Sequence, residues 1–151
     1  MSELLPASGC FEGKAHLLPV RVYYEDTDFT GVVYHANYLR YFERGRSEFL
    51  RLSGVSHTAL RALERPMAFV VVRMEIDFRK AARIDDALIV RTEYDRIARA
   101  RLHVRQTLLR GLDVIAEAVE EIACIDIDGR PRRPPTALMD GLRAWFLQPP
   151  P

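Results

Sequence analysis

The segment YYEDTDFTGVVYHANY, residues 23–38, decides how this chain folds. It joins an apolar strand pattern over residues 16–25 to a helical pattern that follows it. Between the two stand a glycine, Gly31, and two chemically active side chains, Asp28 and His35. Loops between rigid elements often carry catalytic residues, because the scaffold aims their side chains. The segment therefore favours an enzyme.

The helical pattern covers about 16 residues, 38–53, and has charged residues on its opposite face. Asn37 is the predicted N-cap, because its side chain can accept hydrogen bonds from the free N–H groups of a first turn. Gly54 follows where a C-cap prefers glycine. Gly45 costs helix propensity, which indicates close approach of another backbone. Ser56 is predicted to cap a second short helix. The apolar positions of the long helix are Tyr38, Leu39, Phe42, Phe49 and Leu52.

The second half of the chain changes to a period of two. Residues 72–79, VRMEIDFR, alternate apolar and charged side chains, as a half-buried antiparallel strand does. Residues 88–95 and 100–109 alternate in the same way. Residues 114–127 are interpreted as a strand with a bulge, although their first half is compatible with a helix. Thr136 is predicted to cap a short final helix.

One long helix therefore lies between a first strand and a meander of four strands. This order predicts an α+β protein with an antiparallel sheet of about five strands wrapped around the helix. Residues 1–151 fit a single domain, of which 1–15 and 148–151 are expected to be flexible. Sheet edges left open would favour association between copies of the chain.

Composition excludes several classes of protein. The formal net charge of +1 argues against a nucleic-acid binder, which would carry a basic surplus. No window approaches the roughly 20 apolar residues of a membrane span, and no signal peptide is visible. Cys10 and Cys124 are far apart and form no CxxC pair, which favours a reducing compartment. We therefore expect a cytoplasmic protein without an integral membrane segment.

The remaining histidines, His16, His57 and His103, show no ligand spacing such as HExxH, so no metal site is expected. The chain also lacks a glycine-rich phosphate loop and a GxSxG elbow. These absences argue against nucleotide hydrolysis and against serine-esterase chemistry.

Each residue of the loop also has an ordinary structural interpretation. An aspartate before a helix is most often a turn or capping residue, and a lone histidine is most often a structural hydrogen-bonder. The joint occurrence of Asp28 and His35 favours the functional interpretation. Asp26 is predicted to stabilise the loop rather than to act as a second catalyst. Glu43 either reaches the site from the helix or pairs with Arg46.

The run from Tyr24 to Tyr38, with Phe42-Glu43 after it, resembles the hot-dog-fold acyl-CoA thioesterases. It is most similar to the 4-hydroxybenzoyl-CoA thioesterase-like branch associated with the Tol–Pal envelope system. IDFR at 76–79 and ARIDD at 82–86 extend the resemblance. The implied fold is the hot dog, a sheet curled around a long central helix. The resemblance also implies a homodimer or homotetramer with sites at subunit interfaces, and a role in lipid metabolism.

The resemblance places the catalytic carboxylate on Asp28, its partner histidine on His35 and a nearby tyrosine on Tyr24. Asp28 either attacks the thioester carbonyl directly or acts as general base for water. The helix start offers free N–H groups and a partial positive charge, so the backbone at His35 and Ala36 is a candidate for binding the thioester oxygen. Tyr24 is equally compatible with a strand-face or core position.

Four residues are candidates for binding substrate, namely Gly31, Phe29, Ala36 and Asn37. Gly31 permits a tight turn or close approach of the acyl group. Phe29-Thr30 fills positions where the branch more often has small residues, which would reshape the acyl pocket. The implied substrate is an acyl-CoA or an acyl-carrier-protein thioester. Coenzyme A is then part of the substrate, and no separate cofactor is expected.

The sequence thus predicts an acyl-CoA thioesterase that releases a free acid and a thiol. Two alternatives remain open: a hot-dog dehydratase acting on 3-hydroxyacyl thioesters, and a non-catalytic module that binds acyl thioesters or acyl carrier protein. The pattern around Asp28 favours hydrolysis over dehydration. The intact pair of Asp28 and His35 argues against a purely binding module.

Overall fold

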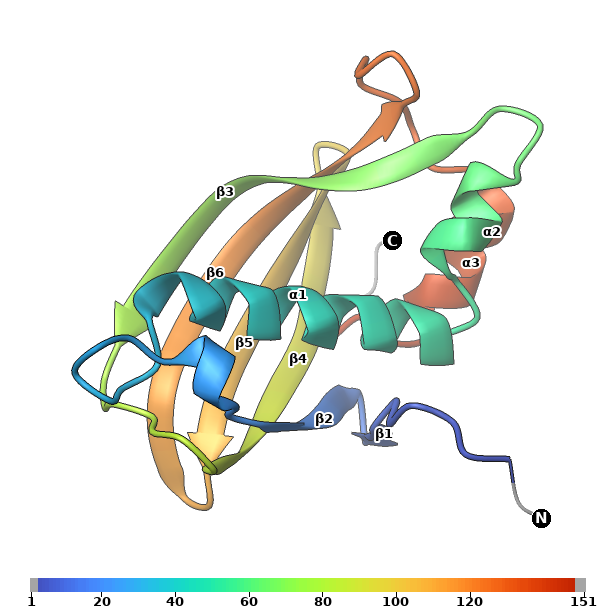
Figure 1. Ribbon diagram of the computed structural model, residues 1–151. Coiled ribbons are helices and arrows are strands. Elements are labelled where there is room, and N and C mark those ends of the chain that lie inside the picture. The colour runs from blue at the N-terminus through green and yellow to red at the C-terminus, as the bar shows by residue number, and fades with distance from the viewer. Residues whose placement is uncertain (1–2, 149–151) are drawn as a thin grey trace.

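The computed structural model describes residues 3–148, so the terminal residues 1–2 and 149–151 of the segments expected to be flexible lie outside it. One antiparallel sheet curves around a long helix, α1 (Figure 1). The strands are β1 Cys10–Glu12, β2 Ala15–Arg21, β3 Met67–Phe78, β4 Ala87–Ala98, β5 Arg101–Arg110 and β6 Asp113–Asp126. The helices are the 3-10 turn η1 Tyr24–Asp26, α1 His35–Leu52, α2 His57–Arg61 and α3 Thr136–Arg143.

The sheet has six strands in the order β1-β2-β4-β5-β6-β3, rather than the predicted five or so. The additional strand, β1, lies within residues 1–15, where the sequence indicated no element. It is only 3 residues long, which is too short to show a period, and it pairs antiparallel with the start of β2. The strand predicted over residues 114–127 is confirmed as β6.

Helix α1 begins at His35, three residues before the start that an N-cap at Asn37 implies, and is 18 residues long. Its N-cap is Tyr34, so the prediction that Asn37 caps the helix is wrong. Asn37 is instead the third helical residue, and its amide donates a hydrogen bond to the Asp26 carbonyl at 2.8 Å. An asparagine side chain can donate as well as accept, and here a carbonyl from the preceding loop uses the donor.

The two shorter helices test the other capping predictions. Ser56 caps α2 as predicted, since its hydroxyl accepts from the Ala59 N–H at 3.1 Å. Thr136 is the first residue of α3 rather than its cap, which is Pro135. Gly54 follows α1 with a φ of +92°, the left-handed conformation that favours glycine after a helix.

The core lies between α1 and the concave face of the sheet. Tyr41, Phe42 and Phe49 on α1 have no exposed surface. Burial of each such side chain contributes about 1.5–3 kcal/mol. Leu39 and Leu52, which the helical pattern placed on the buried stripe, are 43% and 42% exposed. They lie at the edges of the stripe, whereas Tyr41 takes a central position.

Gly45 lies where α1 comes closest to the sheet. A Cβ atom there would lie 2.6 Å from Val90 Cγ1, 2.8 Å from Thr92 Oγ1 and 2.9 Å from Gln106 Nε2. The helix therefore rests on side chains of β4 and β5, and not on another backbone as the sequence indicated. Only glycine leaves the space that this contact needs.

A buried polar cluster continues from this contact. Arg46 donates to Gln106 Oε1 at 2.9 Å and lies 3.0 Å from Glu120 Oε1, while Gln106 donates to Thr92 at 2.8 Å. The Glu120 side chain has no accessible surface, and burial raises its pKa to about 7 against the opposing effect of Arg46. Glu43 pairs with Arg46 at 2.6 Å, which is one of the two predicted alternatives.

Candidate active site

The loop between η1 and α1 is a small ordered hairpin. The Asp28 N–H donates to the Val32 carbonyl at 2.9 Å, and the Gly31 N–H donates to the Asp28 carbonyl at 3.0 Å. The Val33 N–H donates to the Ala82 carbonyl at 2.8 Å, which fastens the hairpin to the β3–β4 connection. Gly31 has a φ of +82° and open space where a Cβ would stand, so the turn itself requires glycine.

Two hydrogen bonds from Thr30 hold the carboxylate of Asp28. Its Oδ1 accepts from the Thr30 N–H at 2.8 Å and from the Thr30 hydroxyl at 2.5 Å. The Thr30 hydroxyl, followed by the Thr30 N–H, lowers the pKa of Asp28, and His35 adds a smaller lowering. Within residues 3–148, no hydrogen bond occupies Oδ2. Asp28 is therefore ionised at neutral pH and has one oxygen free to react.

The first turn of α1 lies next along the chain and is not capped by a side chain. Tyr34 makes no side-chain cap, and the turn contains no acidic residue. The first N–H groups of a helix have no intrahelical partner and carry a partial positive charge. Those of His35 and Ala36 can therefore stabilise negative charge. The exposed ring of His35 lies between those of Tyr34 and Phe78, at centroid distances of 4.6 and 6.5 Å.

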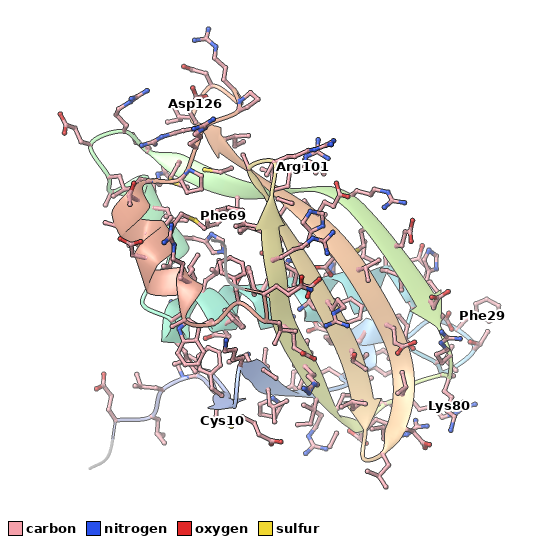
Figure 2. All side chains as sticks on the ribbon, turned by 180° about the vertical axis from the view of Figure 1, so that it is seen from behind. Cys10, Phe29, Phe69, Lys80, Arg101 and Asp126 are labelled. Carbon is pink, nitrogen blue, oxygen red and sulfur yellow. The ribbon has the colours of Figure 1, made fainter. Side chains whose placement is uncertain are left out.

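An open hollow of about 440 Å³ lies over the hairpin, and its lining includes Asp28. Phe29 is fully exposed, and Figure 2 shows it projecting from the end of the molecule at which β3 ends. Tyr24 is 83% exposed on the same hollow, which excludes the core position left open for it. The complete lining is Tyr24, Thr27, Asp28, Phe29, Gly31 and Ile84.

Most of the predicted site residues thus gather in one place. Tyr24, Asp28, Phe29 and Gly31 line the hollow, whereas His35 and Ala36 lie outside its lining, at the start of α1, from where His35 contributes to the lowered pKa of Asp28. Asn37 differs, because it is buried and its amide is engaged by the loop. Ile84, from the β3–β4 connection, was not predicted as a site residue. In the sequence Ile84 is a lone apolar residue within ARIDD, and in the structure it is 44% exposed.

The comparisons with known proteins agree with this geometry. A curved antiparallel sheet around one long helix, with a carboxylate beside the helix start, defines a hot-dog-fold protein. The Thioesterase-like superfamily matches this sequence over residues 22–146. The chain belongs to that superfamily, and the predicted hot-dog fold is confirmed.

Individual relatives are similar over most of their length. The acyl-CoA thioesterase YbgC of Haemophilus influenzae is 41% identical over 128 residues, which cover 85% of this chain and 91% of the relative. The acyl-CoA thioester hydrolase YbgC of Escherichia coli O157:H7 is 40% identical over 80% of this chain and 90% of its own. The crystal structure of a probable thioesterase from Bartonella henselae has a TM-score of 0.78 at 46% identity, and the match covers 80% and 99% of the two chains.

Two further findings concern residues 3–148. None of the helices in this range has both the length and the apolar character that a membrane crossing requires. The same range contains no group of three or more His, Cys, Asp or Glu side chains arranged to bind a metal ion.

Proposed function

We propose that this chain is an acyl-CoA thioesterase, which hydrolyses an acyl thioester to a free acid and a thiol. The observation that carries the proposal is an ionised carboxylate with one free oxygen, next to an uncapped helix start. Relatives about 40% identical over most of both chains carry the same activity in their names. A nucleophile or base beside an oxyanion site is what acyl transfer needs.

The reaction follows from these positions. In one route, Asp28 Oδ2 bonds to the thioester carbon, the C–S bond breaks, and water then cleaves the mixed anhydride. In the other, Asp28 takes a proton from the water whose oxygen attacks the carbonyl carbon, the C–S bond breaks, and the proton passes from Asp28 to the leaving thiolate. In both, the N–H groups of His35 and Ala36 stabilise the oxygen as it becomes negative. The side chains of His35 and Tyr24 orient the thioester.

The hollow supplies the binding surface. Phe29 and Ile84 offer apolar area to the acyl group, while Gly31 keeps the turn free of a side chain. An acyl-CoA or an acyl-carrier-protein thioester fits this role equally. We propose that no metal or separate cofactor takes part, since coenzyme A enters as part of the substrate.

Association between copies belongs to the same proposal. Strand β3 is an edge strand of 12 residues, and edge strands present unpaired backbone groups. Two β3 strands paired antiparallel about Met74 would place Arg73 opposite the partner's Glu75, so the edge complements itself. This pairing supports a homodimer. Association of two such dimers would give a homotetramer. The two free cysteines, Cys10 and Cys124, support a cytoplasmic location, and an acyl thioester as substrate supports a role in lipid metabolism.

Release of free thiol from a panel of acyl-CoA esters tests the activity, with short, long and aromatic acyl groups. We expect turnover by the wild type, and a fall in kcat of about 10²–10⁴-fold in Asp28→Asn. The melting temperature should change little, because Asp28 lies in a partly exposed turn and asparagine keeps an acceptor oxygen for Thr30. Asp128→Asn is the matched control, since it makes the same change in an exposed turn after β6 and should keep full activity.

Other outcomes would identify the alternatives. Full activity in Asp28→Asn would remove the role assigned to Asp28. An enoyl thioester as product would identify a dehydratase. Binding of esters without thiol release would identify a binding module.

A further inference from the structure

We propose that Asn37 is a positioning residue for catalysis. Its side chain ties the first turn of α1 to the loop that carries Asp28, and thereby sets the spacing between the carboxylate and the first-turn N–H groups. This inference rests on the proposed thioesterase function. It assigns Asn37 a task separate from contact with the substrate.

One carbonyl oxygen joins the two parts of the site. The carbonyl of Asp26 accepts from the Tyr34 N–H at 2.9 Å and from the Asn37 amide at 2.8 Å. Tyr34 is the last residue before α1, and Asn37 is the third residue within it. The loop is therefore pinned on both sides of the helix start.

Asp26 is itself held at its other end. Its carboxylate accepts from the Tyr23 N–H at 2.8 Å, which closes η1. The residue is 8% exposed, and together with burial its carboxylate raises the pKa of Tyr41. Because side chain and main chain are both fixed, the Asp26 carbonyl gives the helix a rigid point of attachment. The sequence-based prediction of Asp26 as a loop-stabilising residue is thereby confirmed.

The position of the tie relates directly to the site. Asp28 follows Asp26 by two residues, and His35 and Ala36 immediately precede Asn37. Within residues 3–148, the Asn37 amide makes the one side-chain hydrogen bond between the first turn of α1 and residues 23–33. A misplacement of about 1 Å between reacting groups can cost about 10²-fold in rate.

The chemistry of the position restricts it to asparagine. Asn37 is 6% exposed, so its hydrogen bond is shielded from water and strong. Serine is too short to reach the carbonyl, and glutamine is too long for a first-turn position already packed. An ionised aspartate would turn an acceptor toward the acceptor oxygen of Asp26.

The substitution Asn37→Asp tests the inference through pH. An ionised carboxylate at position 37 cannot donate, whereas its protonated form donates an O–H to the Asp26 carbonyl. Burial and the Asp26 carboxylate raise the pKa of a carboxyl group at this position, whereas the Tyr41 hydroxyl, as a donor, opposes them. Asp28 stays ionised in that range, because Thr30 holds its pKa low.

We therefore expect kcat per folded molecule in Asn37→Asp to be about 10- to 10²-fold below wild type at pH 8. At pH 5 it should recover toward the wild-type value, with KM nearly unchanged throughout. Asn37→Leu, which can never donate, should show the same deficit at both pH values. The folded fraction is followed by circular dichroism at each pH.

Two results would overturn the inference. One is an unchanged kcat per folded molecule in both variants, with activity lost only in proportion to unfolding, as a purely structural role requires. The other is recovery at pH 5 in Asn37→Leu as well as in Asn37→Asp. If Asn37→Asp does not fold at pH 8, Asn37→Leu alone decides. A normal kcat in Asn37→Leu would refute the positioning role of the Asn37 hydrogen bond. Absence of thiol release from the wild type would instead refute the thioesterase function itself.

Discussion

Asp28 and Glu120 are two carboxylates whose pKa values the same fold shifts in opposite directions. Asp28 lies in the partly exposed hairpin, where the hydroxyl and N–H of Thr30 lower its pKa. Glu120 lies beneath α1, where burial raises its pKa to about 7. Arg46 is 3.0 Å from Glu120, yet neither carboxylate oxygen of Glu120 receives a well-aligned hydrogen bond.

A nearby cation therefore does not by itself keep a carboxylate charged. Desolvation disfavours the ionised form, and only directed donors or solvent compensate for it. The hairpin supplies such donors at a position that substrate can reach, whereas the core supplies a single guanidinium shared among several acceptors. Reactivity therefore lies at the exposed carboxylate, and the cost in stability lies at the buried one.

Removal of Arg46 should lower the free energy of unfolding more than the other substitutions considered below. Arg46→Met leaves Glu120 buried without a cation, and breaking a buried pair costs about 3–5 kcal/mol of unfolding free energy. Urea unfolding at pH 8 measures this loss, which should be smaller at pH 5, where Glu120 is protonated. Arg51→Met is the control, because Arg51 pairs with Glu48 at the surface and its loss costs at most about 1 kcal/mol. Equal losses in the two variants would contradict the account.

Removal of the Glu120 charge should abolish one component of the pH dependence. The folded-state pKa of Glu120, about 7, exceeds its unfolded value of roughly 4.3. The folded protein thus binds the extra proton, and the wild type loses stability as pH rises from about 4.5 to about 7. Relative to the wild type, Glu120→Gln should gain up to about 3 kcal/mol across this window. Unfolding free energies that stay parallel from pH 4.5 to 7.5 would refute it.

The smallest effect is expected from a substitution that returns the pKa of Asp28 toward that of an ordinary aspartate. Thr30→Val removes the hydroxyl donor, so the pKa of Asp28 rises toward its usual value of about 3.9. The acid limb of kcat/KM should move to higher pH, while rates at pH 7 change little. Thr27→Val is the matched control, because the Thr27 hydroxyl donates to the Tyr24 carbonyl instead of to Asp28. An acid limb that coincides with the wild type would show that Thr30 does not tune Asp28.

The sequence predicted those features that repeat or that stand close together in the chain. Alternation over residues 72–79 and 100–109 placed long strands, and the helical period placed α1. The hairpin motif brought Asp28 and Gly31 to the site. Strand β1 was not predicted, because three residues are too few to show a period.

Features that depend on a distant partner could not be predicted in this way. The sequence allows Asn37 to donate or to accept, and only the position of the Asp26 carbonyl decides between them. Ile84 joins the hollow because the β3–β4 connection folds back on the hairpin, which no local pattern indicates. Glu120 and its half-buried neighbour Glu121 are the same residue type, and the register of β6 decides that Glu120 takes the inward position.

The contact at Gly45 has a consequence for protein engineering. Replacing a glycine in the middle of a helix by alanine ordinarily stabilises a protein by about 1 kcal/mol. Here the added methyl group would press on Val90 and on the amide of Gln106, and α1 would have to lift from the sheet. The helix also carries His35 and Ala36 at its start, so that displacement would reach the active site. A routine thermostabilising substitution would thus weaken both the fold and the enzyme.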